Sequence, residues 1–196
     1  MIIRIASKVV KRFVDNSVID DTEQELYLYG FFVLISQILY FILTIIFGIL
    51  LDIVLQSVIF YVTFQFIRRY AGGIHASSEL KCEVMTITSI FLCLLCVKLS
   101  EMIDLQNPIL VLTLIATIAI FILSPLDTPE KPLTKEEFQY FRKISLIVLT
   151  TMLFVIIVSV IIKSSISYPI CLSIILEGIL LIAGKIKREY SNKHVK

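Results

Sequence analysis

Six apolar runs constrain this chain more than any other feature of its sequence. They cover residues 30–51, 53–67, 84–97, 108–126, 144–162 and 166–184. An apolar run of about 20 residues can cross the roughly 30 Å hydrocarbon core of a bilayer as one helix. Because lipid offers the backbone no hydrogen-bond partners, only helices and closed barrels span a membrane. The chain is 58% hydrophobic, against about 45–50% in soluble domains. The sequence therefore predicts one all-α polytopic membrane domain over residues 1–196, with about six transmembrane helices.

Two of the runs, 53–67 and 84–97, are short for a membrane span. Both border the polar segment 68–83. They can cross the membrane if they tilt and if Arg68 and Arg69 extend their side chains to the interface. Alternatively, part of 68–83 re-enters the membrane, which requires that protein or water covers its backbone. The sequence leaves both arrangements open.

The first 16 residues predict an amphipathic helix on the membrane surface. Its apolar side would carry Ile2, Ile5, Ala6, Val9, Val10 and Phe13, and its basic side Arg4, Lys8, Lys11 and Arg12. A basic face opposite an apolar one suits an anionic lipid surface. The alternative is a helix that packs on the rest of the protein. The next helix is predicted to start with a capping box at Thr22–Glu25.

The distribution of Lys and Arg predicts the orientation in the membrane. With six spans, one side receives residues 1–29, 68–83, 127–143 and the basic tail 185–196. These segments hold 16 Lys and Arg residues, whereas the segments on the other side hold 2. Cytoplasmic loops carry the excess of positive charge. Both termini and the segment 68–83 are therefore expected in the cytoplasm.

The polar segment 68–83 holds the residues best suited to chemistry. His75 is one of two histidines in the chain, and Cys82 is the one cysteine in a polar setting. An imidazole that takes the proton of a thiol generates a strong nucleophile at neutral pH. On a continuous helix the two residues would be about 10.5 Å apart along the axis, so the backbone between them must leave the helix. The alternative is a loop histidine and a structural cysteine that never meet.

The pattern Arg-Arg-x-x-x-Gly-x-His at 68–75, followed by Cys82 after seven residues, resembles the accessory gene regulator B (AgrB) family. The length near 200 residues and the multiple spans are also similar. This resemblance implies a membrane cysteine endopeptidase that cleaves the AgrD precursor of a quorum-sensing peptide and helps to cyclise it. It implies that Cys82 is the nucleophile and His75 its general base. It also implies a homodimer.

Four further residues are candidates for substrate binding. Arg68 and Arg69 could bind carboxylates of the precursor, which is acidic at its discarded end in this family; they could equally be interfacial anchors. Gly73 matches a glycine of the family motif, with a positive φ or a close backbone approach as its physical role. Glu177 is an acid within a span, and such a residue is a functional candidate by default. It could contact the site, bind the precursor, hold a dimer or be structural.

The remaining features limit the other functions that this chain can have. Cys93, Cys96 and Cys171 lie in apolar runs, where a small buried side chain is the expected role. A net charge of +2 implies no nucleic-acid partner, and neither a cofactor nor a metal is expected. The expected partners are an AgrD-like precursor, anionic lipid and a second copy of the chain. A peptide exporter and a non-catalytic membrane scaffold are the alternatives to the enzyme.

Overall fold

The computed structural model describes residues 2–16, 18–73, 79–103, 105–127 and 133–194. Within these ranges the chain is helical apart from short connections and one isolated backbone bridge. The helices are α1 (Ile2–Asp15), α2 (Gln24–Leu50), α3 (Val54–Ala71), α4 (Glu79–Met102), α5 (Gln106–Leu123), α6 (Lys135–Ile161) and α7 (Ser167–His194), with a 3₁₀ turn, η1, at Asp21–Glu23. The all-α expectation is confirmed for the described part of the chain.

Five of these helices are long and apolar enough to cross a membrane. They cover Gln24–Leu50, Leu80–Met102, Gln106–Leu123, Lys135–Ile161 and Ser167–Tyr190. Helix α3, which corresponds to the short run 53–67, is not among them. Its sequence mixes apolar residues with Gln56, Gln65, Arg68 and Arg69, and this polarity lowers its hydropathy.

The chain forms two compact units, residues 1–43 and 44–196. The first unit holds α1 and most of α2, and the ring centroids of Phe13 and Phe31 are 5.6 Å apart there. Ala6 and Val10 on the apolar side of α1 are buried, whereas Ile5 is 46% exposed. The chain itself thus covers only part of that side, while all four basic residues of α1 are exposed.

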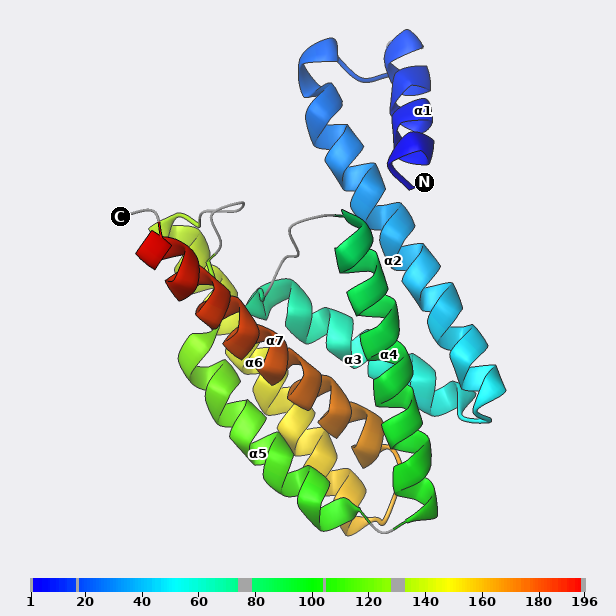
Figure 1. The fold of residues 1–196 in the computed structure, drawn as a ribbon, viewed down its shortest axis with the longest axis vertical. Helices are drawn as coiled ribbons and strands as arrows, with labels where there is room; N and C mark the ends of the chain where they lie inside the picture. The colour runs from blue at the N-terminus through cyan, green and yellow to red at the C-terminus, as the bar shows by residue number, and fades with distance from the viewer. Residues whose placement is uncertain (1, 17, 74–78, 104, 128–132, 195–196) are drawn as a thin grey trace. The chain divides into compact units, whose positions relative to one another are not determined.

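Helix α7 is the centre of the second unit. It contacts α3, α4, α5 and α6, and Figure 1 shows it running along α5 and α6. It is buried over most of its apolar length, whereas the other candidate spans expose most of theirs. A Cβ built on Gly178 would lie 2.8 Å from the Cβ of Ala116, so glycine lets α7 approach α5 closely.

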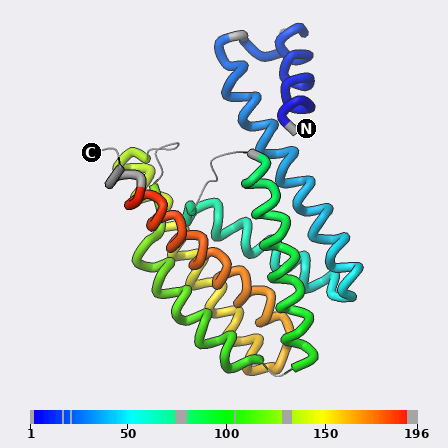
Figure 2. The backbone as a smooth tube through the Cα atoms, in the orientation of Figure 1, coloured from blue at the N-terminus to red at the C-terminus, as the bar shows by residue number. Residues whose placement is uncertain are grey.

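A tight turn joins α2 to α3 and reverses the chain, as the tube in Figure 2 shows. Asp52, at the predicted turn, takes a φ of 57°, and the Ile53 N–H donates to the Gly48 carbonyl oxygen at 2.8 Å. A Cβ on Gly48 would lie 2.9 Å from the Cβ of Ser57. The small residue at 48 therefore allows the two helices to meet directly after the turn.

Several helix ends differ from the sequence expectation. Thr22 lies inside the 3₁₀ turn Asp21–Glu23 instead of capping α2. Helix α6 begins at Lys135, inside the loop expected at 127–143, and Thr134 and Glu137 form the capping box there. Helix α7 continues to His194, through the expected tail at 185–196. Charged residues continue these helices because the hydrogen-bond ladder does not need an apolar side chain at each position.

Candidate functional site

Helix α3 ends where two consecutive glycines begin. Gly72 has a φ of 82° and Gly73 a φ of 139°, values that residues with a side chain rarely adopt. The Gly72 N–H donates to the Arg68 carbonyl oxygen at 3.2 Å, which completes the last turn of the helix. Arg68 and Arg69 are therefore helical, and the non-helical backbone of the polar segment 68–83 begins at Gly72.

A side chain at either glycine would meet a neighbour. A Cβ built on Gly72 would lie 2.7 Å from the Leu126 carbonyl oxygen, and one built on Gly73 would overlap the guanidinium of Arg68. Both the backbone conformation and the space therefore favour glycine at these positions. The positive φ expected at Gly73 is present.

Backbone pairing connects this turn to the segment that follows α5. The Leu126 N–H donates to the Ala71 carbonyl oxygen at 2.9 Å, and Gly72 and Leu126 form a parallel bridge. Ser124 lies two residues earlier, and its hydroxyl is 2.7 Å from that of Ser145 on α6. The end of α3 is thus held by residues distant from it in the sequence.

Arg68 and Glu177 face each other between α3 and α7. Arg68 Nη1 is 3.7 Å from Glu177 Oε2, an ion-pair distance, and the Glu177 side chain is 0% exposed. The same nitrogen donates to the Gly72 carbonyl oxygen at 2.7 Å. A buried carboxylate is costly without an opposite charge, which Arg68 supplies. Arg69, the next residue, is exposed.

Cys82 lies in the first turn of α4, as the fourth residue of that helix. Its side chain is half-buried and its thiol is free. The Thr86 hydroxyl donates to the backbone carbonyl oxygen of Cys82 at 2.9 Å. His75 and the side chain of Glu79 lie outside the described residues, so the contact between His75 and Cys82 stays a prediction.

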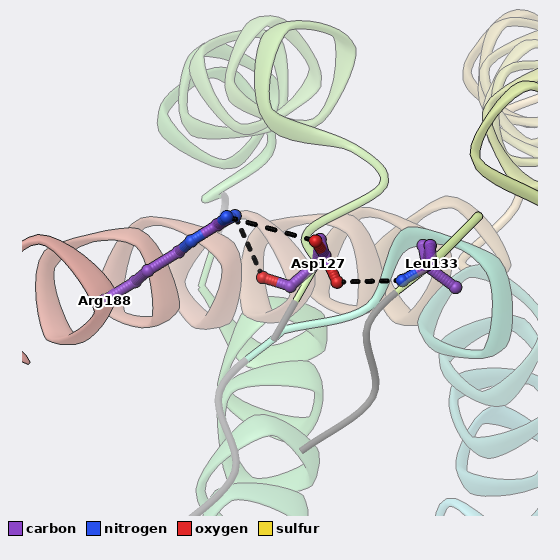
Figure 3. A network of polar contacts seen from close by, with 3 residues as sticks. All are labelled: Asp127, Leu133 and Arg188. Atoms are coloured by element: carbon purple, nitrogen blue, oxygen red, sulfur yellow. Dashed lines mark hydrogen bonds and ion pairs between the residues drawn. The ribbon is translucent and has the colours of Figure 1, made fainter. Parts of the chain in front are cut away.

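Asp127 joins a second set of contacts beside the same turn (Figure 3). Its carboxylate accepts from the Leu133 N–H at 3.1 Å and lies 3.9 Å from Arg188 Nη2. Arg188 Nη1 also donates to the Asp127 carbonyl oxygen at 3.1 Å. Asp127 directly follows Leu126, so these contacts attach the neighbourhood of Gly72 to the end of α7.

The family model described as Accessory gene regulator B (AgrB) matches residues 4–181 of the chain. The chain belongs to the AgrB family. An AgrB-like protein of Clostridium perfringens (strain SM101 / Type A) is 31% identical over 185 residues, which are 90% of this chain and 86% of that protein. A second AgrB-like protein, of C. perfringens (strain 13 / Type A), is 28% identical over 89% of this chain and 86% of the relative. No solved structure matches the chain.

Membership of the AgrB family gives the site its biological setting. It implies a role in the agr quorum-sensing system and an association with an AgrD-like precursor. The family is associated with peptide processing and with membranes, in agreement with the five apolar helices. The matched range contains Arg68, Gly73, His75, Cys82 and Glu177.

The other three cysteines of this AgrB-family chain lie in the interior of helices, away from the turn. Cys93 and Cys96 are on α4, and Cys171 is on α7. Cys93 is 11 residues after Cys82 on the same helix, which corresponds to about 16 Å along the axis. All three thiols are free. Only Cys82 is close in sequence to the break between α3 and α4.

The sequence gives no signal for the residues that hold the turn from outside. By sequence alone, Leu126 and Asp127 mark only the end of a span and the start of a loop, and Arg188 belongs only to a basic tail. No local pattern connects these residues with Gly72. The capping box at Thr134–Glu137 did carry a signal, since Thr-x-x-Glu before an apolar run is its usual form, and it would have placed the start of α6.

Proposed function

We propose that this chain is a membrane cysteine endopeptidase that cleaves an AgrD-like precursor and promotes cyclisation of the released peptide. The observation that carries the proposal is the position of Cys82. It is a half-buried, free thiol in the first turn of α4, close after the helix break at Gly72–Gly73. Family membership provides the substrate class.

The first chemical step is acylation of Cys82. The imidazole of His75 takes the thiol proton, and the sulfur attacks the carbonyl carbon of the scissile peptide bond. The C–N bond then breaks, and His75 returns the proton to the leaving amine. The C-terminal part of the precursor departs, while the N-terminal part stays on Cys82 as an acyl-thioester.

The second step transfers that acyl group within the peptide. A thiol of the precursor attacks the thioester carbonyl, the Cys82 thiolate leaves, and a thiolactone ring forms. One thioester replaces another, so the exchange is close to neutral in free energy. A hydroxyl at the same place in the precursor would give a lactone. A serine at position 82 would form an ordinary ester and lose this balance.

Two residues next to the helix break are proposed to contact the precursor. Arg69 is exposed, and its guanidinium can pair with carboxylates at the acidic end of the peptide. Gly73 is proposed to contact the precursor through its backbone, since the guanidinium of Arg68 occupies the space that a side chain would fill. Arg68 and Glu177 face each other inside the fold, and their buried pairing favours a role in positioning over direct binding.

The asymmetry of Lys and Arg supports a cytoplasmic site in a multi-pass protein of the bacterial cell membrane. A cysteine introduced in place of Lys135, in a protein without its other cysteines, should then react with an impermeant reagent only from the cytoplasmic side. Reaction from outside the intact cell would refute this orientation.

Two further partners are proposed, anionic lipid and a second copy of the chain. The exposed basic residues of α1 suit anionic headgroups, at about 1 kcal/mol for each charge near the surface. Replacing Arg4, Lys8, Lys11 and Arg12 by Gln should weaken contact of α1 with anionic vesicles, as measured by hydrogen exchange; equal protection would refute this contact. The mass of the detergent-solubilised protein, corrected for bound detergent, tests the homodimer.

The decisive experiment uses purified protein in liposomes with a synthetic precursor, without ATP or an ion gradient. Cleavage, with a precursor fragment on Cys82 that hydroxylamine releases, is the expected result by mass spectrometry. Cys82→Ala should bind the precursor without cleaving it, whereas Cys93→Ala, Cys96→Ala and Cys171→Ala serve as matched controls that keep activity. Uptake of intact peptide would indicate an exporter, and neither cleavage nor uptake a scaffold.

A further inference from the structure

Glu177 is a buried acid whose charge the surrounding helix does not neutralise. It is 0% exposed, and neither of its carboxylate oxygens has a hydrogen-bond partner in the described part of the chain. The 3.7 Å separation from Arg68 Nη1 is an ion pair without a hydrogen bond. An apolar residue would fill this position in a span at a lower cost in free energy. The acid at this position therefore indicates a role that needs its negative charge.

The partner of Glu177 is also the residue that holds the end of α3. Arg68 Nη1 donates to the Gly72 carbonyl oxygen at 2.7 Å while it faces Glu177 Oε2. One nitrogen therefore lies between a carboxylate on α7 and a backbone carbonyl at the helix break. Movement of the guanidinium would change both contacts together.

The guanidinium also occupies the space beside Gly73. A Cβ at that position would overlap it, so the absence of a side chain at Gly73 lets the chain pass Arg68 this closely. Gly73 is followed, two residues later in the sequence, by His75. The direction in which the chain leaves α3 is thus set by Arg68 on one side and by the Leu126 bridge on the other.

We propose that Glu177 is a positioning residue for the chemistry of His75 and Cys82. Its carboxylate holds the Arg68 guanidinium against the Gly72 carbonyl, and this contact fixes the backbone at Gly72–Gly73, which precede His75 in the sequence. The inference rests on the proposed endopeptidase function. It assigns Glu177 no contact with the precursor.

The test compares Glu177→Gln, which removes the charge and keeps the shape, with Arg68→Lys and with the double variant. Ser173→Ala is the matched control, because Ser173 is a buried polar residue one turn earlier on α7 with its hydroxyl bonded within that helix. Each protein carries Cys82 and lacks Cys93, Cys96 and Cys171. Precursor cleavage gives kcat and KM, and thermal unfolding gives stability.

For Glu177→Gln we expect kcat to fall by about 10²-fold, the size typical of a small misplacement of reacting groups, with KM within about twofold of the parent value. The double variant should be no slower than the slower single variant, because residues that act through one contact are not additive. Ser173→Ala should match the parent. Additive losses, or a loss confined to KM, would show that Glu177 binds the precursor directly and would overturn the proposal.

A second measurement needs no precursor. The rate at which iodoacetamide alkylates Cys82, followed against pH, reports whether an imidazole assists the thiol. Glu177→Gln should change this profile in the same direction as His75→Ala, whereas a residue needed only for folding would leave it unchanged in the folded protein. Because this readout is independent of cleavage, it tests Glu177 even if Cys82→Ala still cleaves the precursor and the proposed function fails.

A third variant separates positioning from folding. Arg68→Met with Glu177→Leu replaces the pair by apolar side chains of similar size, a change that often preserves folding. We expect a folded protein that alkylates Cys82 like the His75→Ala protein and cleaves about 10²-fold more slowly than the parent. A folded double variant with parental kcat would overturn the proposal.

Discussion

In the described part of the chain, helix α7 forms two ion pairs with residues of other segments, and these pairs differ mainly in their surroundings. Arg68 and Glu177 are 3.7 Å apart, and Arg188 and Asp127 are 3.9 Å apart. The exposed fractions of the side chains are 22% and 0% in the first pair but 45% and 31% in the second. The first pair connects α7 to the last turn of α3, and the second connects α7 to Asp127, next to the bridge from Gly72 to Leu126. The two pairs are therefore similar in the distance between their charges but differ in how deeply those charges are buried.

Burial changes how much each ion pair contributes to the stability of the fold. Charges in water gain little from pairing, about 0–1 kcal/mol, and their attraction is screened by salt. In the interior, the loss of one partner leaves a charge without compensation, at a cost of about 3–5 kcal/mol. The buried pair is therefore expected to be necessary for the local structure. The exposed pair is expected to add little stability to the 3.1 Å hydrogen bond from Arg188 to the Asp127 carbonyl oxygen.

The largest expected effect comes from Arg68→Met, which leaves Glu177 buried without its counter-charge. We expect the free energy of unfolding to fall by about 3–5 kcal/mol, together with loss of precursor cleavage. Denaturant unfolding in mixed micelles measures the first effect. A loss below about 1 kcal/mol would place this pair in the same class as Arg188 and Asp127.

A smaller effect is expected for Gly73→Ala, which tests whether the guanidinium is held in place. A residue with a side chain at this φ costs about 1–3 kcal/mol, and the methyl group would also displace Arg68. Gly30→Ala is the control, because nothing lies within 4 Å of its added Cβ and alanine favours a helix by up to about 1 kcal/mol. Equal stability of the two variants would show that Arg68 moves freely.

The exposed pair should respond weakly to mutation. Arg188→Gln is expected to lower the free energy of unfolding by about 0–1 kcal/mol, and 1 M salt should remove most of the difference from the parent. Unfolding at low and high salt checks this. A loss of several kcal/mol that persists in salt would contradict the comparison of the two pairs.

The smallest expected effect is that of Arg68→Met combined with Glu177→Leu on stability. Apolar replacement of a buried pair is often neutral or stabilising, so the double variant should unfold within about 1 kcal/mol of the parent. A double variant as unstable as Arg68→Met alone would mean that the lost Gly72 contact, and not the unpaired charge, is what destabilises the chain.

The helices were predictable from the sequence because apolar runs and glycines act locally. The apolar runs located α2 to α7, and the polar segment 68–83 marked the break between α3 and α4. Charged helix ends were harder to place, as the extension of α6 back to Lys135 shows. The sequence indicated Glu177 as a functional candidate because an acid is rare in a span.

The contacts of the site depend on how distant helices pack, and no local pattern encodes this. Arg68 and Glu177 are 109 residues apart in the sequence, so their pairing follows from the position of α3 on α7. The bridge from Gly72 to Leu126 has the same origin. Sequence patterns therefore identify which residues are chemically unusual, but not which of them meet.

The central position of α7 has a consequence for biosynthesis. A chain emerges from the ribosome N-terminus first, at about 5–20 residues per second, so α3 reaches the membrane well before Glu177 is made. Until α7 arrives, the Arg68 side chain can keep its charge in water by extending to the interface. The last helix to be synthesised brings the counter-charge that draws Arg68 onto Gly72, so the site can be completed only once translation of α7 has ended.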